Sequence, residues 1–172
     1  MKLPKSVKSD KLQLVGLEGI RLIVGVMSDT HGHFLAAREA IEFFEREGVG
    51  HVIHCGDVGG EEVFGELLGR PITFVWGNTD TLNDGLVAYL KATGFTVPDG
   101  VPARIELGGK KFAVFHGHEP QFRSSKQLDV DFVLYGHTHE ADVEVLDGKC
   151  FVNPGALFRA NPKTVATINT QT

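Results

Sequence analysis

Five short apolar segments of this chain each end in a residue that can bind a metal, with a glycine beside it or close to it. In open α/β sheets, ligands bind at the carboxyl ends of the strands. Because neighbouring parallel strands end at the same edge of a sheet, we expect the five ends to converge on one small volume. The ends read Ser28-Asp29-Thr30-His31, Gly56-Asp57, Gly77-Asn78, His116-Gly117-His118 and Gly136-His137-Thr138-His139.

The chain between these ends predicts an α/β fold in which mixed β-sheets are covered by helices. In the first half, runs rich in β-branched and aromatic residues alternate with stretches of helical periodicity. In the second half, Gly108-Gly109 and Asp147-Gly148 each separate two apolar runs, which indicates hairpins. The predicted strands are residues 22–27, 52–55, 72–76, 104–107, 111–115, 132–135, 143–146, 150–152 and 165–168, and the predicted helices are residues 34–46, 61–68 and 86–92.

The first 19 residues differ in amino-acid pattern from the rest of the chain. They are rich in Lys at first and then weakly apolar. We interpret residues 1–19 as an N-terminal extension and residues 20–172 as one folded domain, since no repeat or linker composition interrupts the latter. The sequence does not decide whether the extension is a tail or an added edge strand.

Composition limits the classes of function. The chain carries 17 basic and 22 acidic residues, a formal net charge of −5, which argues against a general nucleic-acid-binding surface. The longest strongly apolar stretch, residues 22–27, is far too short to cross a bilayer, and no secretory signal is evident. Cys55 and Cys150 do not make a disulfide framework. We therefore expect a cytoplasmic protein that does not enter a membrane.

The residue types at the five ends favour a metal centre. Carboxylate, amide oxygen and imidazole together suit Mn, Fe, Ni or Zn. Each short motif alone is more often a turn or a helix cap, but all eight histidines fall in close pairs, at 31/33, 51/54, 116/118 and 137/139. Seven ligands suit two ions about 3.5–4 Å apart if one carboxylate bridges them, which is the standard device for attack on phosphorus.

In their order along the chain, these motifs resemble those of the calcineurin-like metallophosphoesterase superfamily, and more closely its small bacterial and archaeal phosphodiesterases. The run Asn153-Pro154-Gly155 also resembles the closing turn of that family. The resemblance covers nearly all of residues 20–168. It implies a four-layer αββα fold, in which two mixed β-sheets pack as a sandwich with helices outside.

The resemblance also implies an activity, that of a two-metal-dependent phosphoesterase acting on phosphodiesters, in which a hydroxide that bridges the ions is the nucleophile. Two divalent ions are implied, Mn²⁺ first, with Ni²⁺, Fe²⁺ or Zn²⁺ as alternatives. Asp57 bridges them, and Asp57 and Asn78 count among the catalytic residues. The first ion is implied to be held by Asp29, His31, Asp57 and His139, and the second by Asp57, Asn78, His116 and His137.

One position departs from the family pattern. Many family members have Gly-Asn-His where this chain has Gly77-Asn78-Thr79, and that histidine can protonate the leaving group. Threonine cannot act as an acid near pH 7, so we expect weak or selective activity on simple alkyl esters. His118, Asp80 and His33 are the alternative donors. We favour His118 as a catalytic residue, for substrate contact or as the acid, because its Cβ should lie on the same side as that of His116.

Three further residues each have a functional and a structural interpretation. His54, inside an apolar segment, either orients a ligand from behind or is a hydrogen-bonded core histidine. His51 is interpreted as a surface or capping residue. Arg159 either reaches a phosphate or lies on the surface.

The main alternative function is that of a non-catalytic scaffold. A eukaryotic trafficking-complex subunit shares the family fold and binds partners through its surface, but its ligand set is degraded, whereas all seven positions are filled here. A phosphomonoesterase is the second alternative. The expected partner is a phosphate-ester small molecule or a nucleotide as substrate, and the oligomeric state, a homo-oligomer included, is left open.

Overall fold

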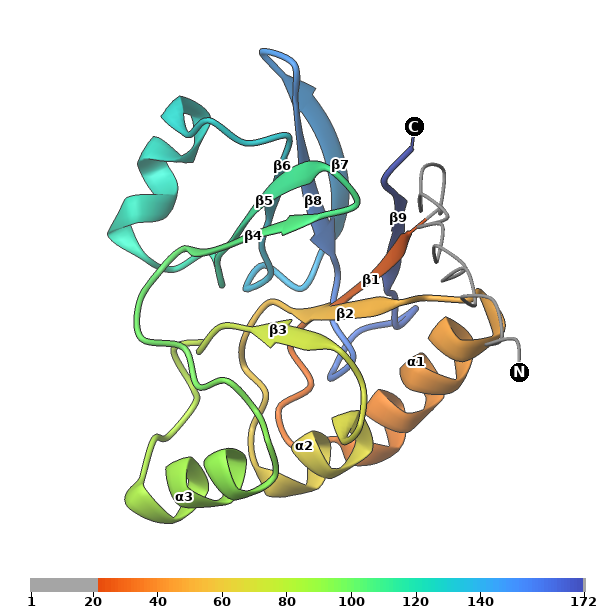
Figure 1. Cartoon of the computed structure of the whole chain (residues 1–172), viewed down its shortest axis with the longest axis vertical. Helices are drawn as coiled ribbons and strands as arrows, with labels where there is room; N and C mark the ends of the chain where they lie inside the picture. Colours follow the sequence, from red (N-terminus) through yellow and green to blue (C-terminus); the bar gives the residue numbers. More distant parts are fainter. Residues whose placement is uncertain (1–21, 172) are drawn as a thin grey trace, which may run out of the picture.

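The computed structural model of the chain describes residues 22–171 and contains two β-sheets (Figure 1). The predicted extension, residues 1–19, lies outside the described residues. The first sheet has the strand order β3-β2-β1-β9, in which the first three strands are parallel and β9 is antiparallel. Its strands are β1 (Ile23–Met27), β2 (His51–His54), β3 (Ile72–Phe74) and β9 (Ala166–Asn169).

The second sheet is also mixed and has the strand order β4-β5-β6-β8-β7. Its three central strands are parallel, and each edge strand forms an antiparallel hairpin with its neighbour at one of the glycine turns. Both predicted hairpins are therefore confirmed. The strands are β4 (Ala103–Leu107), β5 (Lys110–Val114), β6 (Phe132–Leu134), β7 (Ala141–Leu146) and β8 (Lys149–Pro154).

Three α-helices cover the outer face of the first sheet, as Figure 1 shows. They are α1 (Phe34–Arg46), α2 (Glu61–Leu67) and α3 (Asp84–Ala92). Their buried side chains, Phe44 and Phe64 among them, form one core cluster with the sheet. The helix α3 begins two residues before its predicted start, because the Asn83 side chain caps it by accepting a hydrogen bond from Leu86 N at 2.9 Å.

The outer layer over the second sheet is thinner. Within residues 22–171 its one helical element is the 3₁₀ helix η1 (Pro120–Gln127), whose Phe122 packs edge-on against Phe115. The inner faces of the two sheets meet in a separate core of side chains such as Val24, Ile53 and Leu134. Two mixed sheets packed as a sandwich with helices outside confirm the expected fold class. None of the helices in residues 22–171 is long and apolar enough to span a membrane.

The register of the parallel strands determines where the site lies. Met27 pairs with His54 and His54 with Phe74 in the first sheet, while Val114 pairs with Leu134 in the second. The five strands β1, β2, β3, β5 and β6 therefore deliver their carboxyl ends to one region, where the two sheets meet.

Candidate metal centre

The loops after β1, β2 and β6 bring together the residues implied to hold the first ion. The Nε2 atom of His139 is 3.2 Å from Asp29 Oδ1 and 3.4 Å from His31 Nε2. The same His31 atom is 3.5 Å from Asp57 Oδ2. One atom each from Asp29, His31 and His139 lies within 4.8 Å of the others, which is the spacing of a metal site.

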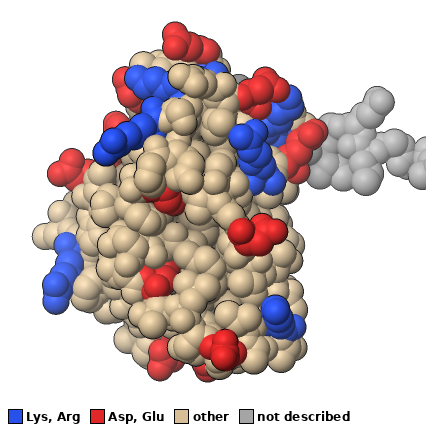
Figure 2. Space-filling model, turned by 90° about the vertical axis from the view of Figure 1, so that its left-hand side faces the viewer, with Lys and Arg blue, Asp and Glu red and all other residues tan. Residues whose placement is uncertain are grey.

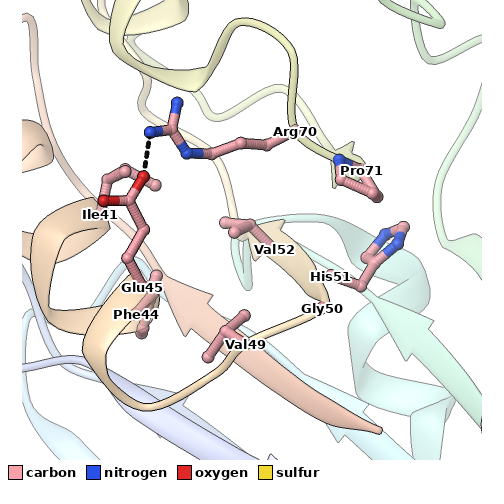
Figure 3. A pocket seen from close by; sticks show the side chains of 9 residues that line it. All are labelled: Ile41, Phe44, Glu45, Val49, Gly50, His51, Val52, Arg70 and Pro71. Carbon is pink, nitrogen blue, oxygen red and sulfur yellow. Dashed lines mark hydrogen bonds and ion pairs between the residues drawn. The ribbon is translucent and has the colours of Figure 1, made fainter.

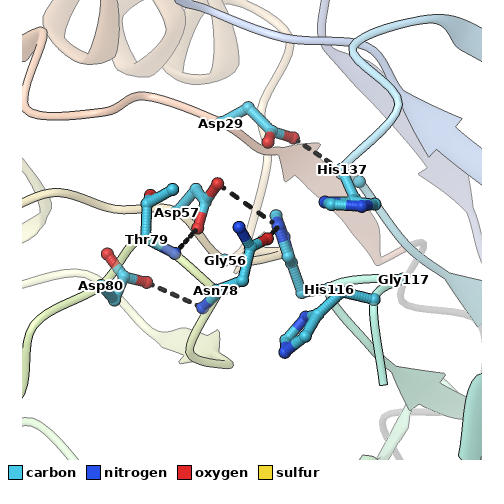
Figure 4. Close-up of polar contacts among 12 residues, drawn as sticks. Asp29, Gly56, Asp57, Asn78, Thr79, Asp80, His116, Gly117 and His137 are labelled. Carbon is cyan, nitrogen blue, oxygen red and sulfur yellow. Dashed lines mark hydrogen bonds and ion pairs between the residues drawn. The ribbon is translucent and has the colours of Figure 1, made fainter. Parts of the chain in front are cut away.

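The residues implied to hold the second ion lie beside the first group (Figure 4). The Nε2 atom of His116 is 3.1 Å from Asn78 Oδ1 and 3.4 Å from Asp57 Oδ2. The ring of His137 is 5.1 Å from that of His116, and its backbone N–H donates to Asp29 Oδ2 at 3.1 Å. The structure thus brings all seven predicted ligands into one cluster.

Asp57 lies between the two groups. Its Oδ2 atom faces His31 on one side and His116 on the other, at 3.5 and 3.4 Å, while Oδ1 accepts a hydrogen bond from Thr79 N at 2.9 Å. Burial alone would raise the pKa of this carboxyl, but the hydrogen bonds from Thr79 and the charges of His116 and His31 bring the pKa below its ordinary value. Asp57 therefore lies within reach of both groups, and its bridging role stays a prediction.

Several lone-pair atoms of the cluster face one another without a proton between them, and cations would satisfy them. The Nδ1 atom of His116 lies 2.8 Å from the Cys55 carbonyl oxygen, which can only accept, so in the neutral form of the ring, the form that binds a cation, Nδ1 carries the proton and Nε2 is a lone-pair atom. That lone pair faces the oxygens of Asn78 and Asp57, an arrangement of acceptors without a proton between them. In addition, the fully buried Asp29 Oδ1 makes no hydrogen bond, and the polar side-chain atoms near it are the Nε2 atoms of His139 and His31, at 3.2 and 3.8 Å. Cations at these points would satisfy both groups.

The ligand loops have an unusual backbone. Outside glycine, seven of the described residues have positive φ, and five of these are predicted ligands. Such conformations are strained and persist only where the surroundings hold them, typically at functional sites. The five ligands are Asp29 (φ 53°), His31 (44°), Asp57 (54°), His137 (71°) and His139 (63°).

Two glycines make room for the carboxylates. A Cβ on Gly77 would lie 2.0 Å from Asp57 Oδ1, and a Cβ on Gly136 would lie 2.6 Å from Asp29 Oδ2. Both distances are far below van der Waals contact. The glycines beside the ligands therefore allow the loops of different strands to approach each other closely.

Several residues that sequence reasoning missed, or gave another role, hold these loops. The Glu119 carboxylate accepts from the backbone N–H groups of His116 (2.8 Å) and Gly117 (2.7 Å). The Asn153 side-chain amide donates to the Gly136 carbonyl at 3.0 Å. In the sequence, Asn153 was noted only as part of the closing turn. Glu119 was not noted, and the signal that could have found it is its position directly after the His-x-His motif.

His54 ties two ligand loops together. Its Nδ1 accepts from Gly56 N at 3.2 Å, so its Nε2 donates to Thr30 Oγ1 at 2.9 Å, and Thr30 in turn donates to the Val58 carbonyl at 2.9 Å. Burial, with the charge of His116 as a second cause, lowers the pKa of His54 to about 3. Both interpretations of His54 apply: it is a buried, hydrogen-bonded core histidine, and through these hydrogen bonds it positions the loops that carry the ligands.

The three alternative proton donors have different surroundings. Both carboxylate oxygens of Asp80 accept backbone N–H groups, from Gly59 and Gly77, each at 2.8 Å, so Asp80 holds loops and is poorly placed as an acid. The Nδ1 of His33 accepts from Ala36 N and caps α1. His118, with a ring 5.3 Å from that of His116 and a side chain 36% exposed, lies open to solvent beside the second group.

His51 does not cap a helix, which corrects one part of its expected role as a surface or capping residue. His51 begins β2, is half-buried, and forms a hydrogen bond with Thr73 Oγ1 at 3.0 Å, and burial lowers its pKa. It lines a cavity of about 160 Å³ at the amino ends of β2 and β3, near the Arg70–Glu45 ion pair (Figure 3). That cavity lies at the opposite ends of the strands from the metal ligands. Arg159, for its part, is exposed and lies over the ring of Phe158.

A sandwich of two mixed sheets, with carboxylates and imidazoles gathered at the strand ends, defines a metal-dependent hydrolase class. The chain matches the calcineurin-like phosphoesterase superfamily domain over residues 22–172. It is 37% identical to a phosphodiesterase of Methanocaldococcus jannaschii over 138 residues, which covers 77% of this chain and 82% of the relative. The chain therefore belongs to the calcineurin-like phosphoesterase superfamily.

Solved structures agree with this assignment. An archaeal phosphodiesterase superimposes with a TM-score of 0.71 and 32% identity, over 86% of this chain and 99% of that protein. The Zn²⁺ complex of vacuolar protein sorting 29 from Entamoeba histolytica superimposes with a TM-score of 0.56 and 25% identity, over 78% of this chain and 74% of that protein. The fold is thus shared by a phosphodiesterase and a sorting protein.

Proposed function

We propose that this protein is a two-metal phosphodiesterase. The observation that carries the proposal is the position of Asp57, whose Oδ2 atom faces the imidazoles of both ligand groups at nearly equal distance. One carboxylate can therefore serve two cations, and the remaining ligands divide into three on each side. We infer two divalent cations, Mn²⁺ first with Ni²⁺, Fe²⁺ or Zn²⁺ as alternatives, since the cluster offers only nitrogen and oxygen donors.

When bound, two such cations make a strong nucleophile from water near neutral pH and neutralise charge on the phosphoryl oxygens. The residues of this chain supply the rest. The tautomer of His116 is fixed by the Cys55 carbonyl, so that its free nitrogen points into the cluster. His31 is oriented by Thr79, whose hydroxyl lies 3.3 Å from His31 Nδ1. His118 is placed to give a proton to the departing oxygen or to contact the substrate.

The proposed substrates are phosphodiesters of small molecules or nucleotides, acted on in the cytoplasm. The relatives that match most of this chain include phosphodiesterases, which favours diesters over monoesters. On the face drawn in Figure 2, Lys and Arg side chains are interspersed with Asp and Glu. This mixture and the net charge of −5 favour a small substrate over a long nucleic acid.

The test is hydrolysis of bis-p-nitrophenyl phosphate by chelator-stripped protein, with Mn²⁺ added back. We expect turnover to return with the metal. Removal of a residue that only hydrogen-bonds to a metal ligand lowers activity by roughly 10–100-fold. Asp57→Asn should lower the turnover by more than this, because both ligand groups share this carboxylate. Asp99→Asn, in an exposed loop away from the cluster, is the matched control and should keep full activity. Full activity in Asp57→Asn would disprove the bridging role.

A scaffold function is the second candidate, because a sorting protein shares the fold. A scaffold predicts that the protein binds metal without turning over any phosphodiester. Metal content measured in the same sample as turnover separates the two functions. Bound metal without hydrolysis of the nitrophenyl ester would favour the scaffold.

A further inference from the structure

Phe158 and Arg159 form an aromatic and positively charged surface beside the first ligand group. The Phe158 ring lies 5.4 Å from the His31 ring at a tilt of 45° and 6.3 Å from the His33 ring. The guanidinium carbon of Arg159 lies 4.9 Å from the centre of the Phe158 ring, over its face. Phe158 is half-buried and Arg159 is exposed, so the pair is open to solvent. We call these two residues the platform.

The platform is fixed relative to the metal ligands. The residue before it, Leu157, is buried in the core under α1, and its backbone N–H donates to the Ser28 carbonyl at 3.3 Å. Ser28 directly precedes the loop that carries Asp29 and His31. A ring anchored in this way needs little ordering when a ligand stacks on it.

The backbone and the position of Arg159 distinguish it from an ordinary surface residue. Its φ is 50°, and the other non-glycine residues with positive φ are the five metal ligands and Asp147 of a hairpin turn. The Arg and Lys ion pairs found among residues 22–171 use Arg38, Arg70 and Lys111. Arg159 shares the lack of a carboxylate partner with most described Arg and Lys residues, and differs from them in lying beside the ligand group, on the Phe158 ring. A free cation beside a phosphoesterase centre is available to an anionic substrate.

We propose that the platform binds the nucleoside of a nucleoside phosphodiester whose phosphorus lies at the metal centre. This inference rests on the proposed function and names its substrate class. Nucleobases stack on aromatic rings and on guanidinium planes, and the platform offers both together. An alkyl ester has no flat group to stack, so the platform should distinguish the two kinds of diester.

The test compares two substrates that share one leaving group, the p-nitrophenyl esters of thymidine 5′-phosphate and of ethyl phosphate. With the Mn²⁺-loaded protein, Phe158→Leu and Arg159→Gln should each lower kcat/KM for the thymidine ester by about 10-fold and change that for the ethyl ester less than twofold. Phe158→Tyr keeps a flat ring and should keep the preference. Phe43→Leu and Arg123→Gln remove an exposed aromatic and an exposed cation elsewhere and serve as controls.

Two results would overturn the platform. An equal loss on both esters would mean that Phe158 acts only by packing against His31, and no loss on either would mean that substrate does not reach it. If the unaltered protein hydrolyses neither ester, the proposed function fails, and calorimetry then tests the platform separately. Thymidine 5′-phosphate should bind more tightly than ethyl phosphate, and Phe158→Leu should remove the difference.

A further arm identifies the source of the nucleoside. A dinucleotide and a single-stranded decanucleotide ending in the same residues present the same base to the platform. Equal kcat/KM per end would indicate that nucleic-acid ends are substrates, whereas a clear preference for the dinucleotide would indicate a small nucleotide. If Phe158→Leu leaves kcat/KM unchanged for both the dinucleotide and the decanucleotide, the platform does not bind the base and the proposal is contradicted.

Discussion

Thr79 shows how much one residue can do for the ligands around it. Its backbone N–H holds Asp57 Oδ1 at 2.9 Å, and its hydroxyl lies 3.3 Å from His31 Nδ1. With a cation on Nε2 of His31, Nδ1 would carry the proton and donate to the hydroxyl. The sequence suggested only that an acid is missing at this position. The structure adds that the threonine orients a ligand.

Replacing Thr79 separates these two roles. Thr79→Val removes the hydroxyl but keeps the N–H, and should weaken metal binding, so that the Mn²⁺ concentration needed for half-maximal activity rises by roughly 10-fold or more on all esters alike. Thr79→His should raise turnover of an alkyl ester relative to a p-nitrophenyl ester by about 10-fold or more, because it supplies an acid that only a poor leaving group needs. For this ratio, rates on both esters are measured at saturating Mn²⁺. An unchanged ratio in Thr79→His would mean that the proton comes from elsewhere.

His54 makes folding sensitive to acid. Its pKa is about 3 in the folded protein against 6.5 when unfolded, so between these values the unfolded chain binds a proton that the native protein does not. The free energy of unfolding should therefore fall as pH is lowered from about 6.5 toward 3, by up to about 1.4 kcal/mol per pH unit from this residue. Urea unfolding of the metal-free protein at several pH values gives the free energy of unfolding as a function of pH, and this free energy should depend less steeply on pH in His54→Gln. Equal slopes would contradict the assignment.

At the scale of elements, periodicity and turn residues predicted much of the fold. The bounds of α1 match its apolar spacing, and the glycine turns gave both hairpins. The 3₁₀ helix η1 was not predicted, since its sequence is mostly polar and buries few side chains. The positive φ values of the ligand loops were also not predicted, because aspartate and histidine, although enriched among non-glycine residues with positive φ, adopt it at only a minority of positions. The candidate ligands, by contrast, followed from the order of motifs at strand ends.

The close approach of loops leads to a prediction about glycine. Gly77→Ala would place a methyl group 2.0 Å from Asp57 Oδ1, so the loop after β3 must move and Asp57 with it. We expect kcat/KM to fall by at least about 10-fold, with a lower Tm. Gly65→Ala in α2 is the matched control, because its added methyl group meets nothing within 4 Å. It should raise stability by about 0.5–1 kcal/mol and leave activity unchanged. Wild-type activity in Gly77→Ala would show that the loop adapts freely.

At the scale of the whole molecule, the candidate centre joins the two halves of the sandwich. Asp29, His31 and Asp57 come from loops of the first sheet, and His116 and His139 from loops of the second. The carboxylates and imidazoles face each other across the sheets, and the buried Asp29 oxygen makes no hydrogen bond. Metal that binds this cluster must therefore bind the folded chain far better than the unfolded chain, in which these residues are scattered along the sequence.

Metal removal should consequently lower the stability of the entire domain. A cation at 1,000 times its Kd adds about 4 kcal/mol to the free energy of unfolding, which is on the order of 10 °C in Tm for a chain of this size. Thermal unfolding of chelator-stripped protein with and without Mn²⁺ measures this shift. His139→Ala, which removes one first-group ligand, should shrink the shift, whereas His51→Ala, at the opposite end of β2, should leave it intact. An identical Tm with and without Mn²⁺ would mean that the cluster does not hold metal, whatever the activity of the sample.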